Sequence, residues 1–430
     1  MIAATGGSAW IAAMLEVECA LAAAAEDAGV VPKGVAQAIA AASKSLALDP
    51  ETLQAAGLRA GTPVIPLVAA LSAAAGAAGG WVHYGATSQD VVDTALALVS
   101  RRASAVLRED LAGVARSLAA LARTHRHSVM PGRTLLQHGS PTTFGLKACG
   151  WLVGVIEAHG GLAGAVAALP VQLGGAVGTL AVLGDRASAV VAGFAAQLDL
   201  PIATLPWHTN RVAIARLGSA LAITAGVLGK IAGDLVLLAQ SEVAEIAERR
   251  EPGRGISSAM PQKRNPTASI EAIAAARRAA PAAASLLSAL DHEQERAAGA
   301  WQAEAPLIVE LFGLIAHAAA ALRRALDGIE IDVLRMRANL DPAGGWAADA
   351  LAAELAPSLG RDTAHQIVRD ALRRSRGESL AAALAAEVRV SPHKAVLDVL
   401  LADPLAAAGP VDSLVDAALA RYAASRLEDS

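Results

Sequence analysis

A regular spacing of apolar residues between about 91 and 127 most constrains what this chain can fold into. The residues that repeat at intervals of four and three are Leu107, Leu111, Val114, Leu118 and Leu121. This spacing is typical of a helix that packs lengthwise against other helices. Further long apolar segments lie around 142–167, 210–248, 266–290 and 301–326, and short loops marked by glycine or proline separate them. The pattern predicts an elongated bundle of five long helices.

The composition favours an all-α fold. Of the 430 residues, 54% are hydrophobic, only 3% are aromatic and 18% are charged. Alanine and leucine dominate, and both residues favour helices. The periodic segments and the breaks between them predict three helical domains: an N-terminal domain over 1–90, a central bundle of long helices over 91–340, and a C-terminal domain over 341–430.

Charge, hydropathy and cysteine content argue against several classes of protein. The net charge is −4 and no segment is rich in lysine and arginine, so we expect no nucleic-acid partner. The mean hydropathy is +0.43, but glycines, His159 and Pro170 interrupt the longest uncharged stretch, 158–184, so we expect no membrane-spanning helix. Cys19 and Cys149 form no CxxC motif and no secretory leader is recognisable, which predicts a cytoplasmic protein without disulfides.

Metal and cofactor sites are not expected either. His125 and His127 are two residues apart on a predicted helix and therefore point to different faces. The glycine-rich segment 174–178 has no predicted strand before it, so it does not match a dinucleotide-binding motif.

Polar, catalytically capable residues gather in three separated segments with loop-forming residues. The segments are 83–90 (HYGATSQD), 132–145 (GRTLLQHGSPTTFG) and 253–266 (GRGISSAMPQKRNP). Each alone has a structural explanation: Thr-Ser-x-Asp and Ser-Pro-Thr-Thr also start helices, and a single histidine is often structural. The third segment combines glycines and prolines with Ser257, Lys263 and Asn265, which indicates a loop that binds or deprotonates a ligand.

Together, in this order, the segments resemble the fumarase/aspartase superfamily, whose signature reads Gly-Ser-Ser-x-Met-Pro-x-Lys-x-Asn-Pro. Residues 255–266 (GISSAMPQKRNP) match it with one residue inserted after the glycine. The resemblance covers nearly the whole chain. It implies a homotetramer whose core is the long central bundle, active sites shared between subunits, a small polycarboxylate substrate and no cofactor.

The resemblance also implies roles for individual residues. Ser257 would remove a proton next to a substrate carboxylate, and Lys263 and Asn265 would hold the aci-carboxylate that results. Extra negative charge on that group needs fixed donors and a cation, and a serine base needs positive surroundings, which Lys263, Arg264 and the start of the following helix could supply. The other implied substrate contacts are His83, Thr87, Ser88, Arg133, His138, Thr142, Arg211 and Met260.

Within the superfamily, the chain resembles 3-carboxy-cis,cis-muconate cycloisomerases more than adenylosuccinate lyases. The lyases carry a histidine after the Arg-Thr pair and a glutamate that supports it; here Leu135 follows Thr134, and Ile270 stands at the glutamate position with Glu271 next to it. A departing amine must be protonated, whereas a carboxylate is a stable anion with a pKa near ~4. The resemblance therefore implies lactonisation of 3-carboxy-cis,cis-muconate in the β-ketoadipate pathway, with Ser257 as proton donor and His138 as a further catalytic residue.

Two alternatives stay open. One is an amine-releasing lyase, against which Leu135 argues; the other is a catalytically silent helical relative, against which Ser257, Lys263 and Asn265 argue. The cations expected to bind the substrate are Lys263, Arg211, Arg133 and Arg296. Related enzymes have a second arginine two residues after the one at 211, where this chain has Ala213, and this difference leaves the exact substrate open.

Overall fold

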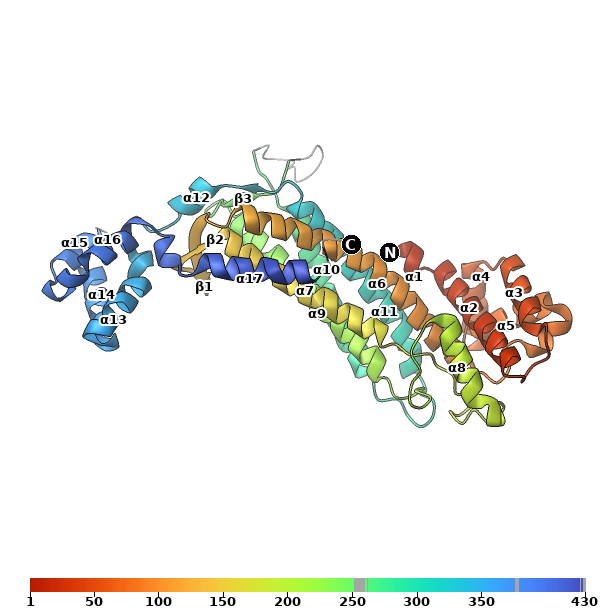
Figure 1. The fold of residues 1–430 in the computed structure, drawn as a ribbon. Coiled ribbons are helices and arrows are strands. Elements are labelled where there is room, and N and C mark those ends of the chain that lie inside the picture. Colours follow the sequence, from red (N-terminus) through yellow and green to blue (C-terminus); the bar gives the residue numbers. More distant parts are fainter. Residues whose placement is uncertain (251–259, 261, 376–378, 426, 428–430) are drawn as a thin grey trace. The chain divides into compact units, whose positions relative to one another are not determined.

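The computed structural model describes residues 1–250, 260, 262–375, 379–425 and 427. The fold is almost entirely helical, which confirms the predicted class (Figure 1). The five longest helices of the bundle are α6 (Ser88–Thr124), α7 (Phe144–Ala167), α9 (Val212–Leu238), α10 (Thr267–Ser288) and α11 (Ala300–Leu326). In α6, the predicted stripe is fully buried at Leu107, Leu111, Val114 and Leu118.

By its contacts the chain forms two compact units, each built from three stretches of sequence. Unit 1 comprises Met1–Asp110, Ala158–Gly226 and Ala274–Ala319, and unit 2 comprises Leu111–Glu157, Val227–Ile273 and Ala320–Ser430. The long helices contribute to both units. The division into three sequence domains remains a prediction.

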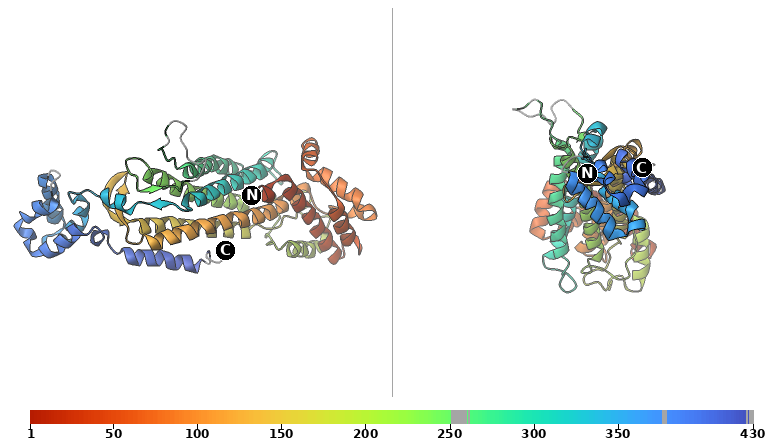
Figure 2. Two further views of the ribbon diagram at one scale, coloured as in Figure 1. Left: turned by 90° about the horizontal axis from the view of Figure 1, so that it is seen from above. Right: turned by 90° about the vertical axis from the view of Figure 1, so that its left-hand side faces the viewer.

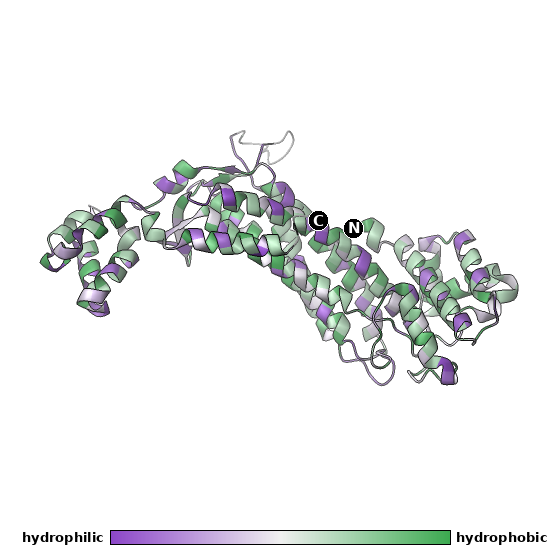
Figure 3. Cartoon of the chain, viewed as in Figure 1, coloured by the Kyte–Doolittle hydropathy of each residue, from purple (hydrophilic) through white to green (hydrophobic). Residues whose placement is uncertain are grey.

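Unit 1 holds the N-terminal helices. These are α1 (Ile2–Thr5), α2 (Gly7–Asp27), α3 (Val35–Ser45), α4 (Pro50–Ala60) and α5 (Val64–Ala74), with α8 (Ala187–Leu198) packed against α2. Figure 3 shows that hydrophobic residues make up much of these helices, with hydrophilic residues spaced among them. Alanine-rich helices pack closely here, and the fully buried Ile39, Leu67 and Leu71 fill the space between them.

Unit 2 adds two small antiparallel sheets to its helices. The first is a hairpin of β1 (Val129–Thr134) and β2 (Gln137–Thr143), and the second pairs β3 (Ile246–Ala247) with β4 (Glu330–Ile331). The shorter helices are α12 (Val333–Ala338), α13 (Ala348–Leu359), α14 (Arg361–Ser375), α15 (Leu380–Ala385), α16 (Lys394–Ala402) and α17 (Val411–Ala424). Helices α13–α16 form one group around their own hydrophobic core, which includes Leu351, Leu355 and Leu380 (Figure 2).

Two local predictions were wrong. The segment 132–145, expected as a loop, is largely the β1–β2 hairpin. The helix expected over 210–248 ends at Leu238, and the chain turns before β3. Ala244, with a φ of 51°, lies at the end of this turn, and the next residue, the buried Glu245, accepts hydrogen bonds from Arg133.

Helices α2, α7, α9 and α11 are long and apolar enough, by length and composition alone, to cross a membrane, and the bent pair α4 and α5 would make a fifth span. Between 44% and 61% of each of the four apolar windows is nevertheless buried within this single chain. Apolar helices of this kind are also typical of a bundle core. The expectation of no membrane partner therefore stays a prediction.

Candidate active site

The signature segment is described only in part. Ser257, the predicted proton donor and acceptor, lies outside the described residues. Met260 is 50% exposed, and Lys263 and Asn265 lie in the irregular segment before α10. Within the part of the chain that the structure describes, the ammonium of Lys263 has no hydrogen-bond or ion-pair partner, so it is available to an anionic ligand.

Hydrogen bonds and an ion pair hold the end of this segment and the start of the helix that follows it. Arg264 donates to both carboxylate oxygens of Glu330, each at 2.8 Å, and to the backbone oxygen of Glu248. Glu248 in turn caps α10, since its carboxylate accepts from the backbone N–H groups of Ala268 (3.1 Å) and Ser269 (2.8 Å). The expectation that Arg264 and this helix start supply positive charge to Ser257 must be revised, because a carboxylate already occupies each of them.

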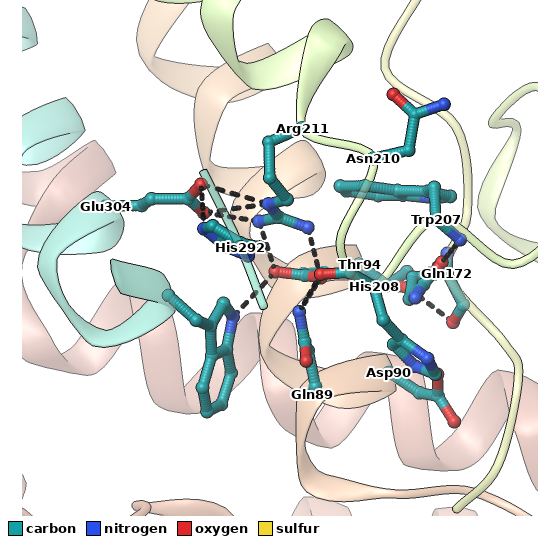
Figure 4. A network of polar contacts seen from close by, with 12 residues as sticks. Gln89, Asp90, Thr94, Gln172, Trp207, His208, Asn210, Arg211, His292 and Glu304 are labelled. Carbon is teal, nitrogen blue, oxygen red and sulfur yellow. Dashed lines mark hydrogen bonds and ion pairs between the residues drawn. The ribbon is translucent and has the colours of Figure 1, made fainter. Parts of the chain in front are cut away.

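The start of α6 is held in place by one buried carboxylate. Asp90, which is 1% exposed, accepts from the backbone N–H groups of Thr87 (3.0 Å), Gly174 (3.0 Å) and Gly175 (2.9 Å). His208 Nε2 lies 2.6 Å from the same carboxylate and acts as a fourth donor (Figure 4). A Cβ on Gly174 would meet the His208 ring at 2.7 Å, so this contact requires glycine. The half-buried Thr87 and Ser88 therefore have fixed positions.

Arg211 lies in a fully buried ionic network (Figure 4). Its guanidinium donates to both oxygens of Asp93, at 2.7 and 2.9 Å, and to Glu304 at 3.0 Å. Burial alone would lower the pKa of Arg211, but the charges of Asp93 and Glu304 outweigh it and raise that pKa. Direct binding of substrate by Arg211, as predicted, would require its ion pair with Asp93 or Glu304 to break. The geometry therefore favours a structural role for Arg211.

Arg296 is a better placed cation in unit 1. It donates to the Gln89 side-chain oxygen at 2.9 Å and to the backbone oxygen of Ala176 at 2.7 Å. These partners are neutral, and Arg296 forms no ion pair with a carboxylate among the described residues. Gln89 lies in the first turn of α6, directly after Thr87 and Ser88 in the sequence, so Arg296 is bound to the start of this helix.

His83 is paired with a carboxylate that the sequence did not reveal. Its Nδ1 lies 2.7 Å from Glu18 Oε1, and its backbone N–H donates to Glu18 Oε2 at 3.0 Å. Glu18 is only 1% exposed and is the single acidic residue on the buried face of α2. An isolated acid among apolar residues of a helix could have identified it in the sequence.

In unit 2, Arg133 makes a bidentate ion pair with Glu245, at 2.9 and 2.6 Å, and the side-chain amide of Asn339 also donates to Glu245. Arg133 is therefore held by a fully buried carboxylate rather than free for substrate. His138 is exposed on β2 and lines a cavity of about 280 Å³ together with Trp346 and Asp349. Thr142 is half-buried on the same strand, opposite Met130.

The structure also describes the positions at which amine-releasing lyases differ from this chain, 135 and 270–271. Leu135 and Leu136 form the two-residue turn of the hairpin and are 96% and 70% exposed. Ile270 is 48% exposed on α10, and Glu271 is paired with Arg324 at 2.6 Å. In the described chain, neither residue offers a carboxylate that could support a proton-donating group at 135.

The predicted site residues thus fall into two groups. His83, Thr87, Ser88 and Arg211 lie in unit 1, whereas Arg133, His138, Thr142, Met260, Lys263 and Asn265 lie in unit 2. No cluster of three or more metal-ligating side chains occurs among the described residues.

Comparison with known proteins decides the family. A family model described as lyase matches residues 4–280. The chain belongs to this lyase family, within the fumarase/aspartase superfamily. The lyase is 44% identical to nitrosuccinate lyase of Streptomyces davaonensis (97% of this chain, 91% of the relative). It is 41% identical to 3-carboxy-cis,cis-muconate cycloisomerase of Bradyrhizobium diazoefficiens (94% of this chain, 91% of the relative).

A solved structure supports the same placement. The lyase resembles 3-carboxy-cis,cis-muconate lactonizing enzyme from Pseudomonas putida with a TM-score of 0.86 and 37% identity, over 96% of this chain and 95% of the other. The predicted superfamily and enzyme class are therefore confirmed. The similarity to a nitrosuccinate lyase adds a candidate substrate that the motifs alone did not suggest.

Proposed function

We propose that this lyase converts 3-carboxy-cis,cis-muconate to 4-carboxymuconolactone without a cofactor. A substrate carboxylate oxygen forms a C–O bond to one carbon of a double bond, and Ser257 delivers a proton to the neighbouring carbon. The electron pair of the double bond passes through an aci-carboxylate, which Lys263 and Asn265 stabilise. The tricarboxylate trianion thus takes up one proton and becomes a lactone with two carboxylates, and Ser257 regains from solvent the proton that it delivered.

The observation that carries this proposal is the hairpin turn. Leu135 stands where an amine-releasing lyase of the superfamily needs a histidine, and Glu271, the nearest acid on α10, is bound to Arg324. Leucine cannot protonate a leaving group. The reaction must then make or break a bond to a group that is stable as an anion, as a carboxylate is.

A second candidate is the cleavage of nitrosuccinate to fumarate and nitrite. The relative of that name is 44% identical, and nitrite is also a stable leaving anion. Nitrosuccinate has two carboxylates rather than three. The carboxylates around Arg211 and the absence of an arginine at Ala213 reduce the number of cations for a third carboxylate.

We also propose a cytoplasmic homotetramer in which subunits share active sites. Large apolar side chains remain exposed on the long helices of the single chain, among them Val212 (51%) and Ile223 (61%) on α9 and Ile270 (48%) and Leu287 (41%) on α10. Burial of such a surface between copies would stabilise an assembly. Placement of the predicted site residues in two units is compatible with sites completed by other subunits.

The deciding experiment offers purified lyase three substrates in parallel: 3-carboxy-cis,cis-muconate, nitrosuccinate and adenylosuccinate. Ultraviolet absorbance reports the first and third, and nitrite release reports the second; Ser257→Ala protein is the matched control. We expect turnover of 3-carboxy-cis,cis-muconate. Preference for nitrosuccinate would replace the proposed reaction by the second candidate, preference for adenylosuccinate would overturn the argument from Leu135, and turnover of none would indicate a silent relative.

A further inference from the structure

A single buried carboxylate holds both the ring and the backbone of His83. Glu18 Oε1 contacts the ring at Nδ1, and Glu18 Oε2 accepts from the backbone N–H of the same residue. The Glu18 side chain is 0% exposed. His83 has a φ of 63°, a left-handed conformation that is unfavourable for a residue with a side chain and persists where surrounding contacts impose it.

This arrangement determines which ring nitrogen faces a ligand. An ionised carboxylate only accepts hydrogen bonds, so Nδ1 of His83 carries a hydrogen and donates it to Glu18. Nε2 points away from that contact, and it has no partner among the described residues. The His83 side chain is 20% exposed, and its Nε2 atom is accessible to solvent.

The charges around His83 favour its protonated form. Burial lowers the pKa of His83, but the hydrogen bond to Glu18 and the charges of Glu18 on α2 and Asp90 on α6 outweigh burial and raise it. With Nδ1 donating to Glu18, protonation adds a second donor at Nε2. When the ring is protonated, the pair presents a cationic N–H group to its surroundings.

The position of the pair relates it to substrate binding. The backbone oxygen of His83 accepts from the N–H of Ala86, and this turn leads directly to Thr87 and Ser88 at the start of α6. Arg296 brings a further positive charge to the same helix start through Gln89. The accessible ring nitrogen thus belongs to the residue whose turn leads into Thr87 and Ser88.

We propose that Glu18 is a positioning residue that holds His83 with Nε2–H directed at a carboxylate of the substrate. His83 then contributes positive charge to substrate binding in an enzyme that lacks a histidine at 135. The inference rests on the proposed function only in requiring a carboxylate substrate. The Glu18–His83 pair itself belongs to the free protein.

The test removes the charge of Glu18 with little change in shape. Glu18→Gln is compared with Glu16→Gln, which removes a partly exposed carboxylate on the same helix that pairs with Arg102. We expect Glu18→Gln to raise KM about 10- to 100-fold, by analogy with the loss of a carboxylate that orients a metal-binding histidine, with a smaller change in kcat. Glu18→Asp should recover part of the loss, and Glu16→Gln should behave as wild type.

A second readout does not depend on turnover. In ¹⁵N-labelled protein, the imidazole of His83, assigned with His83→Gln, should titrate above the ordinary histidine pKa, and Glu18→Gln should lower its midpoint. Binding of tricarballylate, an unreactive tricarboxylate, should weaken in Glu18→Gln and in His83→Gln alike. A wild-type His83 that titrates at or below the ordinary value, or tricarballylate binding that neither variant changes, overturns the inference even if no substrate is turned over.

Discussion

The carboxylate of Glu248 accepts hydrogen bonds from both the backbone N–H and the hydroxyl of Ser269, at 2.8 and 2.7 Å. Glu248, which precedes the signature segment in the sequence, thus caps α10, the helix that follows this segment. A cap of this kind contributes about 1 kcal/mol, and its negative charge also interacts favourably with the helix start.

Removal of this cap should affect both stability and activity. In Glu248→Ala we expect a loss of about 1–2 kcal/mol in unfolding free energy, measured by urea denaturation. We also expect a lower kcat, because the helix start that follows Lys263 and Asn265 is then held less firmly. Glu242→Ala, at an exposed acid in the turn after α9, is the control. Unchanged kcat in Glu248→Ala would show that the cap only stabilises α10.

Ser257 is expected to handle the proton. Ser257→Ala should lower kcat by about 10²–10⁴-fold, the usual contribution of a positioned acid–base group, with an unchanged circular dichroism spectrum. Ser258→Ala serves as the neighbouring control. Near-normal turnover in Ser257→Ala would exclude the serine from proton transfer.

Substitutions in the β1–β2 turn should change the stability and the activity of the protein in opposite directions. Leu135 and Leu136 have φ values of 51° and 65°, a conformation that Asn-Gly adopts far more readily. The double change Leu135→Asn, Leu136→Gly should raise the unfolding free energy by about 1–2 kcal/mol. If the turn contacts substrate in the assembled enzyme, kcat/KM should fall about tenfold or more.

The matched control for that variant is Val388→Asn, which replaces an exposed apolar residue (84%) elsewhere in unit 2. A stabilised double variant with wild-type kcat/KM would show that the turn has no part in the reaction. It would also remove the main argument for an anionic leaving group.

The ion pair of Arg133 and Glu245 should be a major element of stability. Arg133→Met leaves a fully buried carboxylate without its cation, which costs about 3–5 kcal/mol. Arg278→Met breaks the exposed pair with Glu310 and should cost less than about 1 kcal/mol. Urea denaturation compares the two variants, and equal losses would contradict the structural role assigned to Arg133.

His159 should make stability depend on pH. Burial, followed by the charge of Arg108, lowers its pKa from 6.5 to about 4, and its Nε2 accepts from Arg108 Nε at 3.0 Å. The unfolded chain binds a proton at this residue at higher pH than the folded protein does. Its contribution is therefore fully present above pH 6.5 and is lost as the pH falls toward 4.

His159→Gln should flatten that dependence. We expect the wild type to lose up to about 3 kcal/mol more unfolding free energy than the variant between neutral pH and pH 4, measured by denaturation at several pH values. His317→Gln, on an exposed part of α11, is the control. Parallel curves for wild type and His159→Gln would refute the assignment.

Helices were predictable where one periodic pattern decides the structure. The stripe from Leu107 to Leu118 identified α6 because the same four-and-three spacing that sets the helix also sets its buried face. The hairpin was missed because its turn is Leu135-Leu136, which carries none of the glycine or asparagine that usually indicates such a turn. The early end of α9 was missed because residues 239–251 contain neither the glycine nor the proline that usually indicates the end of a helix.

The candidate site was predictable as a set of motifs but not as a set of contacts. Motif matching selected Arg133 and Arg211 as free cations, yet each is bound by carboxylates 93 to 118 residues away in the sequence. Glu18 and His83 are 65 residues apart, and no local pattern connects them. Side-chain pairing across such separations follows from tertiary packing, which a single sequence does not display.

The four donors around Asp90 have a consequence for how such enzymes diversify. Asparagine has almost the shape of aspartate, but its amide would direct N–H groups at donors from Thr87, Gly174, Gly175 or His208, and no rotation of the side chain avoids this. Position 90 therefore does not tolerate asparagine, whereas the exposed side chain of Leu135 is bound by no such set of donors. The position of Thr87 and Ser88 therefore depends on a negative charge at residue 90 and not on the residue at 135.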